Sequence, residues 1–512
     1  MKPPGTPMEQ EAVRALRAGR IVDAARAALR AIDAGGESAL ALWVLARSRR
    51  LAGDQDAALG LLRRATALDP THLPAMQDLG ATLMGAGDAE GALVAFRAAV
   101  ALAPERFALR SAMLVAMHYC ASVTAAEIAA AHRDVGRLVP VRTRPARRRR
   151  APGEPLRIGF VSADFRGHST AAFLPPLLRA CDRERWRVTL YSGVAVPDAA
   201  TSRFRALADD WVDAAFLGDD ALAARIVADG IDVLVDLNGH TAGNRLGTFA
   251  RRPAPLQLTW LDYVHSTGLA AIDFLVTDVD HVHAGEDDLH VETVLRLAPG
   301  TFCFDPPERP PAAARPPGPF TFGSFNALEK LSDDALRAWA EILQAVPWAR
   351  LRLGAVALDR AHGRERVTRT LAACGIAPDR YELLGATDRA GALARHGGVD
   401  LHLDSFPYSG GLTTLEGLWM GTPTLTFRGD RIAGRHSASH LRRIGLPALV
   451  ARDRDDYVAA AVALARTPAR LDDVRGSLRA RVAGSSLVDG AAQARGFADL
   501  VDGALAHPRA HR

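Results

Sequence analysis

The sequence predicts a protein of the α plus α/β class, in which helical repeats precede two Rossmann-like lobes. Two observations support this prediction. Small residues recur every 34 residues through roughly the first 110 residues, and from Leu156 onward short β-rich segments alternate with helical segments. A 34-residue helical period is typical of tetratricopeptide repeats, and the alternation is typical of doubly wound parallel sheets.

The repeat period is carried by small residues that let paired helices approach closely. Three series share one register: Gly19, Gly53 and Gly87; Ala24, Ala58 and Ala92; and Ala12, Ala46 and Gly80. Pro70 and Pro104 are also one period apart. A single ordinary helical bundle would have to explain all three coincident series, so repeats are favoured. Such modules bind peptides or other proteins.

The composition and charge of the chain limit which classes of protein it can belong to. The 512 residues are 48% hydrophobic, enough for several cores, and the net charge of +5 does not indicate a nucleic-acid binder. No apolar stretch reaches the roughly 18 residues of a membrane span, and we find no signal-peptide pattern. We therefore expect a cytoplasmic protein whose four scattered cysteines are reduced: Cys120, Cys181, Cys303 and Cys374.

Four segments are expected along the chain: repeats and connecting helices over 8–135, a Pro/Arg-rich linker over 136–155, a first lobe over 156–315 and a second lobe over 316–505. The basic run 144–150 lies in a Pro-rich stretch and is interpreted as solvated linker. A Pro-rich break at 306–319 separates the lobes.

Each lobe is predicted to contain parallel strands. Those of the first are expected at 157–162, 187–191, 232–236, 256–260 and 274–277. Those of the second are expected at 320–324, 350–354, 381–384, 400–404 and 423–427. In such folds ligands bind where the carboxyl ends of the strands meet. Candidate functional residues are therefore sought directly after the strands.

Two polar motifs follow strands of the first lobe. Ser-Ala-Asp-Phe-Arg-Gly-His-Ser-Thr at 162–170 places His168 at a strand end, where an imidazole can exchange a proton with a group in a cleft. Asp-Leu-Asn-Gly-His-Thr at 236–241 offers side chains that can hold hydroxyls beside a glycine. For each motif the alternative is a polar loop or turn without a functional role.

Two motifs follow strands of the second lobe. Phe-Asn-Ala-Leu-Glu-Lys at 325–330 presents Lys330, which could neutralise the charge on a departing diphosphate. The motif at 404–423 reads as a strand, a small-residue turn and a helix; Gly410, Gly411 and the hydroxyls of Thr413 and Thr414 favour an anion there. Neither the P-loop nor the dinucleotide fingerprint is present. A sugar nucleotide fits better than ATP or NAD.

Together these motifs resemble the O-GlcNAc transferase and SPINDLY family, over about residues 8–470. Supporting stretches are Met-His-Tyr at 117–119, Arg-Pro-Ala-Pro-Leu-Gln-Leu-Thr-Trp at 252–260 and Ala-Gly-Arg-His-Ser-Ala-Ser at 433–439. The resemblance implies a GT-B fold and inverting transfer of a sugar, UDP-GlcNAc being the usual donor, to Ser or Thr of a protein. It also implies no obligatory metal and no other cofactor, with an acceptor protein recruited by the repeats.

Site residues are carried over by motif. The resemblance implies catalytic roles for His168 and Lys330. It implies nucleotide-sugar binding by Asn326, Arg395, Gly410, Gly411, Leu412, Thr413, Thr414 and Glu416. An acceptor and sugar pocket is expected from His240, Thr241, Tyr263 and Thr267. No carboxylate stands out as a general base, so His168 or a chain of water molecules is left to take the acceptor proton.

Three departures from the family pattern bear on the donor. Ala392 stands where the family has a base-stacking histidine, and Ala327 stands where the animal enzymes have a glutamine. The loop Asp-Tyr-Val-His-Ser-Thr-Gly at 262–268 stands where the family usually has Gly-Tyr-Pro-Gly-Thr, then Ser or Thr, and then Gly. Two alternatives remain: a relative that transfers fucose or a nonulosonic acid to a dedicated substrate such as flagellin, and a non-catalytic scaffold.

Overall fold

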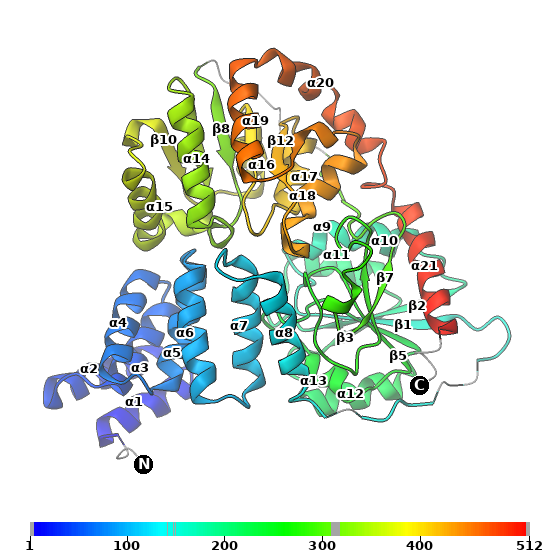
Figure 1. Cartoon of the computed structure of the whole chain (residues 1–512). Helices are drawn as coiled ribbons and strands as arrows, with labels where there is room; N and C mark the ends of the chain where they lie inside the picture. Colours follow the sequence, from blue (N-terminus) through cyan, green and yellow to red (C-terminus); the bar gives the residue numbers. More distant parts are fainter. Residues whose placement is uncertain (1–4, 141, 147, 149, 309–317, 508–512) are drawn as a thin grey trace. The chain divides into compact units, whose positions relative to one another are not determined.

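The computed structural model describes residues 5–140, 142–146, 148, 150–308 and 318–507. They form two compact units. The first contains Met1–Ser122, Asn326–Ala340 and Leu353–Ala386, and the second contains Val123–Phe325, Glu341–Arg352 and Thr387–Arg512. The predicted order of helical repeats followed by two α/β lobes is confirmed (Figure 1).

The repeat helices form three consecutive pairs: α1 (Pro7–Arg17) with α2 (Ile21–Gly35), α3 (Ala39–Leu51) with α4 (Gln55–Leu68), and α5 (Leu73–Gly85) with α6 (Ala89–Leu102). The helix α7 (Phe107–Tyr119) follows and packs on α6. Gly19, Gly53 and Gly87 lie in the turns within pairs, with φ of 73°, 88° and 81°. Glycine adopts this left-handed conformation without steric cost, which explains its recurrence. At Gly80 a Cβ atom would lie 2.7 Å from the Phe96 ring, so glycine allows α5 and α6 to approach.

The first unit also includes part of the second lobe, which packs on the repeat turns. A Cβ atom on Gly87 would lie 2.5 Å from Cγ of Leu328. Arg360 donates to the carbonyl of Gly85 at 2.7 Å, and Asp56 accepts from the backbone N–H of Ala361 at 2.8 Å. The repeats and this part of the lobe therefore share one compact body.

The first lobe, in the second unit, is built on a seven-stranded parallel sheet of order β3-β2-β1-β4-β5-β6-β7. Its strands are β1 (Leu156–Ser162), β2 (Trp186–Ser192), β3 (Asp210–Asp213), β4 (Val233–Asp236), β5 (Leu256–Thr259), β6 (Phe274–Thr277) and β7 (Thr293–Arg296). The strand order reverses between β1 and β4, which is where ligands bind in such sheets. The loops after these two strands therefore meet.

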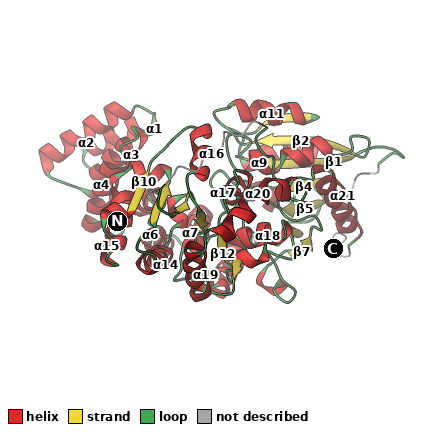
Figure 2. Cartoon of the chain, turned by 90° about the horizontal axis from the view of Figure 1, so that it is seen from above, coloured by secondary structure: helices red, strands yellow, loops and turns green. Residues whose placement is uncertain are grey.

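Helices accompany this sheet, and Figure 2 labels α9, α11 and α21 among them. They are α8 (Ala125–Gly136), α9 (Thr170–Phe173), α10 (Pro175–Ala180), α11 (Ala199–Leu207), α12 (Asp219–Ala228) and α13 (Leu246–Ala250). The last helix, α21 (Gly490–Ala506), also belongs to this core, because Phe497 contacts the rings of Phe160, Trp186 and Trp260. The end of the chain thus completes the first lobe, which local sequence patterns do not reveal.

The second sheet has six strands in the order β10-β9-β8-β11-β12-β13, the same winding as the first. They are β8 (Thr321–Ser324), β9 (Arg350–Gly354), β10 (Tyr381–Leu384), β11 (Leu401–Leu403), β12 (Thr424–Phe427) and β13 (Val450–Ala451). Its helices are α14 (Asp333–Ala345), α15 (Ala361–Ala373), α16 (Arg389–Gly397), α17 (Leu412–Trp419), α18 (His436–Arg443), α19 (Arg454–Arg466) and α20 (Ala469–Ala483). All ten predicted strands are present; β3, β7 and β13 were not predicted.

The basic run differs from its interpretation as solvated linker. Arg144 pairs with the buried carboxylate of Asp273 at 2.7 Å, and Arg148 pairs with Asp232 at 2.9 Å. These ion pairs hold the segment against the first sheet, so the interpretation is wrong for Arg144 and Arg148. Residues 147 and 149, like 309–317 of the Pro-rich break, lie outside the described part of the chain.

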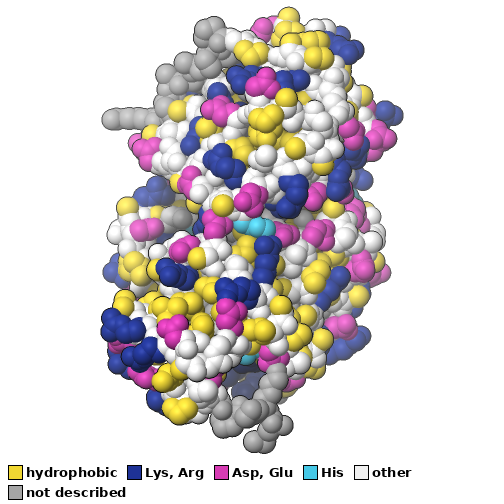
Figure 3. Space-filling model, turned by 90° about the vertical axis from the view of Figure 1, so that its left-hand side faces the viewer, with side chains coloured by type: hydrophobic (Ala, Val, Ile, Leu, Met, Phe, Trp, Pro, Cys, Tyr) yellow, Lys and Arg dark blue, Asp and Glu magenta, His cyan; other side chains and the backbone are white. Residues whose placement is uncertain are grey.

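Surface charge is mixed where it can be seen. In Figure 3, Lys and Arg side chains alternate with Asp and Glu over the face drawn, in keeping with the small net charge. Among the described helices, none has the length and apolarity to cross a membrane.

Candidate active site

The loops after β1 and β4 meet as the strand order requires. Asn238 donates to Asp164 at 2.7 Å and accepts from the backbone N–H of Ala163, also at 2.7 Å. Asp164 also pairs with Arg166 at 2.9 Å. These contacts tie the two predicted motifs into one rigid floor at the carboxyl end of the sheet.

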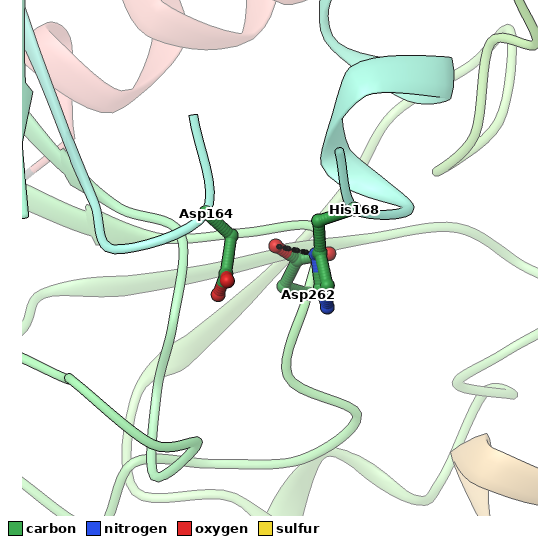
Figure 4. Close-up of side chains that lie close together, drawn as sticks. All are labelled: Asp164, His168 and Asp262. Carbon is green, nitrogen blue, oxygen red and sulfur yellow. Dashed lines mark ion pairs between the residues drawn. The ribbon is translucent and has the colours of Figure 1, made fainter. Parts of the chain in front are cut away.

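His168 lies at the edge of this floor, beside a carboxylate from a third loop. Its Nδ1 is 3.7 Å from Oδ2 of Asp262, which follows β5 (Figure 4). Thr170 stands between them: its hydroxyl is 3.1 Å from Nδ1 of His168 and donates to Oδ2 of Asp262. The His168 side chain is 38% exposed, whereas that of Asp262 is 5% exposed. The imidazole is therefore open to solvent and its carboxylate partner is not.

Asp164, His168 and Asp262 place one ligand-type atom each within 4.8 Å of the others. The two oxygens of Asp164, however, already accept hydrogen bonds from the Arg166 guanidinium and the Asn238 amide. A cation would have to displace the amide and approach a guanidinium. We therefore assign these contacts to hydrogen bonding and not to a metal centre.

A cavity of about 1040 Å³ opens beside His168 within the second unit. Its walls come from the loop after β1, from α9 to α11, from segment 305–308, and from the first residues of α16 and α17, Arg389 and Leu412. His168 and the start of the α17 helix thus border one space. This is the place at which the sequence predicts ligand binding.

The turn before α17 ends in a glycine N-cap. Gly411 occupies the N-cap position, where no side chain caps the helix. The Gly410 N–H is bound by the Asp404 carboxylate at 2.7 Å, so it serves the turn itself. The first N–H groups of a helix attract anions through their partial positive charge. Leu412 and Thr413 at this helix end are half-buried.

Two predicted residues of α17 are buried. The hydroxyl of Thr414 lies 2.7 Å from that of Ser437, which donates to the Gly410 carbonyl at 2.9 Å. Glu416 forms an ion pair with Arg389. Burial raises the pKa of the Glu416 carboxyl, and the Arg389 guanidinium opposes that effect. The predicted Arg395 is half-buried in the last turn of α16.

Arg389 is a site residue that the sequence analysis missed. It is the first residue of α16, lines the cavity, and pairs with a carboxylate predicted to bind the nucleotide. The only signal in the sequence is its place directly after the Asp388 helix cap. That signal does not distinguish Arg389 from an ordinary surface arginine.

The predicted acceptor pocket residues lie in a second cluster, which is closed. His240, Tyr263 and Thr267 are all less than 9% exposed, and none of them lines the cavity. His240 contacts the Thr267 carbonyl at 2.8 Å, and the Tyr263 hydroxyl contacts His132 of α8 at 2.7 Å. Burial lowers the pKa of His240 to about 4.

The remaining members of the two predicted sets have structural partners. The Thr241 hydroxyl donates to the Asn238 carbonyl at 2.8 Å. Lys330 and Asn326 belong to the first compact unit; Lys330 ends the short 3-10 helix Leu328–Lys330 and is half-buried, while Asn326 is buried. Arg366 anchors this loop by donating to the Leu331 carbonyl at 2.8 Å.

Helical repeats, two sheets of the same winding and a cavity at the carboxyl ends of the strands define a repeat-bearing protein with a GT-B pair of lobes. The chain belongs to glycosyl transferase family 41, whose model matches residues 129–301 and 314–496. The resemblance found in the sequence is thereby confirmed.

Similar proteins support this assignment. The chain is 38% identical over 394 residues to the probable UDP-N-acetylglucosamine–peptide N-acetylglucosaminyltransferase SPINDLY of Solanum lycopersicum, covering 74% of this chain and 42% of the relative. It is 29% identical over 339 residues to the probable transferase SEC of Arabidopsis thaliana, covering 64% and 34%. The chain thus spans less than half the length of these relatives.

A solved structure matches nearly the whole chain. A mutant of the Thermobaculum terrenum O-GlcNAc transferase aligns with a TM-score of 0.87 and 35% sequence identity. The alignment covers 97% of this chain and 96% of that one. Repeats and both lobes are therefore shared with a bacterial protein of similar extent.

Proposed function

We propose that this chain is an inverting protein O-glycosyltransferase that moves a sugar, GlcNAc by default, from a nucleotide diphosphate to a Ser or Thr hydroxyl of a protein. The observation that carries the proposal is the cavity at which His168 meets the first residues of α16 and α17. A proton acceptor and an uncapped helix end border one space in a family 41 chain. Sugar transfer to a hydroxyl requires both functions.

In this proposal the anion is held by the α17 helix end with Thr413, and Glu416 accepts from ribose hydroxyls. The family resemblance also assigns nucleotide-sugar binding to Asn326 and Arg395, and it assigns to Lys330 the neutralisation of the departing diphosphate. A charge that becomes important as the diphosphate departs stabilises the transition state more than the bound donor. The Lys330 ammonium therefore acts mainly on the chemical step. The transfer needs no obligatory metal and no further cofactor.

The acceptor protein is proposed to bind through the repeats, α1 to α7. Such stacked helices offer an extended concave surface for peptides. We further propose that the protein works in the cytoplasm. This is supported by its four cysteines, none of which forms a disulfide: Cys120, Cys181, Cys303 and Cys374.

A donor comparison tests the proposal. Purified protein is heated with UDP-GlcNAc, GDP-fucose or a CMP-linked nonulosonic acid, and the unfolding midpoint is measured. A ligand that binds only the folded state raises the midpoint. The bound donor is then incubated with an acceptor protein, and sugar attachment is read by intact mass. Stabilisation and transfer with UDP-GlcNAc support the proposal; no shift with any nucleotide contradicts it.

A related donor is the second candidate, favoured by one observation. Asp262 stands in the loop after β5, where the family usually has glycine, and it places a carboxylate beside His168, which lines the cavity. A changed loop at this position can alter which sugar fits. Stabilisation by GDP-fucose or the CMP-linked acid in the same experiment, without stabilisation by UDP-GlcNAc, would favour this candidate.

Replacing Lys330 tests the chemistry of the leaving group. We expect Lys330→Ala to reduce kcat by at least about 100-fold, because it removes a positive charge that stabilises the departing diphosphate. The unfolding midpoint should stay unchanged, because the Lys330 side chain is only half-buried. Lys330→Arg, which keeps the charge, is the matched control and should retain part of the activity. Lys2 is the other lysine of the chain, so protection of Lys330 from amine acetylation by bound donor is easily read by mass spectrometry. Wild-type turnover in Lys330→Ala would refute the role.

A further inference from the structure

The hydroxyl of Thr170 lies between His168 and Asp262. Thr170, the first residue of α9, is fully buried, and its Oγ1 contacts both Nδ1 of the imidazole and Oδ2 of the carboxylate. The neighbouring Ser169 Oγ makes longer contacts with the same two groups, 3.3 Å to His168 and 3.5 Å to Asp262. The carboxylate thus reaches the imidazole mainly through Thr170.

The hydrogen bonds through the Thr170 hydroxyl determine which nitrogen of the His168 ring carries the proton. An ionised carboxylate only accepts hydrogen bonds, and a hydroxyl has one proton to give. Because Thr170 gives its proton to Asp262, its oxygen must accept from His168, and Nδ1 must carry the proton. A neutral imidazole then has its lone pair on Nε2. Nε2 is the ring nitrogen that contacts neither Thr170 nor Asp262.

We propose that Asp262, acting through the Thr170 hydroxyl, holds His168 in the tautomer whose Nε2 is the general base at the cavity. This rests on the proposed function and names a residue that the family resemblance does not supply. Asp262 touches no reacting atom and is therefore a positioning residue. His168 is the group that meets the acceptor.

The backbone conformation of Leu261, directly before Asp262, supports a functional role for the position of this carboxylate. Leu261 has a φ of 82°, in the left-handed region that a branched side chain rarely occupies. Such strain persists only where the surrounding structure requires it, and it is concentrated at functional sites. Leu261 is itself buried, so packing holds the loop that presents Asp262.

The charged groups around His168 and Asp262 affect the pH range in which Asp262 is ionised. Burial raises the pKa of the Asp262 carboxyl to about 6, with His168 and the Thr170 hydrogen bond opposing and the Asp164 charge reinforcing the rise. Arg166 pairs with Asp164, and on the cavity side the charged neighbours of His168 are Arg179, Arg203, Asp305, Glu308 and Arg389. Above about pH 6 the carboxylate is ionised and the hydrogen-bond chain is complete.

The acceptor hydroxyl oxygen forms a bond to the anomeric carbon while its proton passes to Nε2 of His168. The bond from that carbon to the diphosphate breaks, and its electron pair leaves with the nucleotide. The resulting imidazolium is stabilised by Asp262 through Thr170, as a buried carboxylate stabilises histidine in catalytic triads.

Kinetics of three variants test the chain of groups. We expect Asp262→Asn and Thr170→Val to lower kcat by about 10- to 100-fold with donor KM within about twofold of wild type. The acid limb of the kcat profile should move to lower pH in both, since an imidazole without its carboxylate is less basic. Thr170→Ser keeps the hydroxyl and should restore wild-type values. If Asp262 and Thr170 had only a structural role, the acid limb of the profile would stay at its wild-type pH in Asp262→Asn and Thr170→Val. There would then be no shift for Thr170→Ser to reverse.

The tautomer can be read without any activity. Histidine-selective ¹⁵N labelling reports which ring nitrogen carries hydrogen, and His168→Gln identifies the signal. We expect the Nδ1–H form in wild type and a shift toward Nε2–H in Thr170→Val. A wild-type Nε2–H form, or wild-type kcat and pH profile in both Asp262→Asn and Thr170→Val, would overturn the inference. Activity that is lost with EDTA and restored by Mn²⁺ would also overturn it, by making the cluster a cation site.

The two proposals fail in different ways. If wild-type protein binds and transfers no sugar from any donor, the proposed function is wrong, whatever the tautomer of His168. If transfer is robust and the Thr170 and Asp262 variants are unaffected, the proposed function stands and the positioning role is wrong.

Discussion

Two polar clusters lie at the same edge of the first sheet and differ in what water can reach. The first, His168 with Thr170 and Asp262, keeps an imidazole 38% exposed beside a cavity. The second, His240 with Tyr263, Thr267 and His132, is closed, with His240 2% exposed. The open cluster follows the ends of β1 and β5 and the closed cluster follows those of β4 and β5, so a position at a strand end does not by itself decide whether water reaches a residue.

The difference between them is what each cluster is connected to. The open cluster shares its cavity with the first residues of α16 and α17. The closed cluster joins the helix α8 to the loop after β5 through the His132 to Tyr263 hydrogen bond. We therefore expect changes in the open cluster to affect turnover and changes in the closed cluster to affect stability.

The largest expected effect is on the closed cluster. At Gly239 a Cβ atom would lie 2.3 Å from Cβ of Tyr263, and the backbone φ is 51°. Gly239→Ala must therefore displace the Tyr263 side chain and strain the turn. We expect it to lower the free energy of unfolding by about 3 kcal/mol or more, as measured by chemical denaturation.

Gly476→Ala is the control for this substitution. Gly476 lies within α20, where a Cβ atom would meet nothing within 4 Å. Alanine is favoured over glycine in a helix, so this variant should be neutral or slightly more stable. Equal stability of Gly239→Ala and wild type would show that the closed cluster can rearrange at little cost.

His168→Gln should produce the opposite pattern. Removing the imidazole takes away the proposed base, and we expect kcat to fall by about 100-fold. The side chain is more than a third exposed, so the free energy of unfolding should change by less than about 0.5 kcal/mol. Steady-state kinetics and denaturation on the same preparation measure both. A stable variant with normal turnover would leave the open cluster without a catalytic role.

Sequence reasoning predicts features that depend on spacing. The 34-residue period and the ten strands are local patterns, and the structure confirms them. The positioning role inferred for Asp262 could not be predicted, because it depends on Thr170, a residue 92 positions earlier in another loop. The packing of Phe497 on Trp260 is equally non-local. For His240, the pattern predicts a strand-end position, but burial is a property of how α8 packs on that loop.

The closed cluster should also respond to acid. Because burial lowers the pKa of His240 to about 4, the unfolded state, with an ordinary pKa of about 6.5, binds a proton that the folded state does not. The free energy of unfolding should therefore fall as the pH drops from about 6.5 to about 4. The contribution of one such histidine is at most about 1.4 kcal/mol per pH unit.

His240→Leu isolates this contribution from that of other buried histidines. His290, with a pKa lowered to about 4, and His402, lowered to about 3, act in the same direction, so wild type should show a steep acid dependence. The variant loses the contact with the Thr267 carbonyl and should be less stable at pH 7.5. Its free energy of unfolding should nevertheless change less steeply with pH than that of wild type, when denaturation is measured at several values between pH 4.5 and 7.5. The difference between the two slopes should correspond to at most one bound proton. An unchanged slope would mean that His240 is protonated in the folded protein, and the cluster would then be open to water after all.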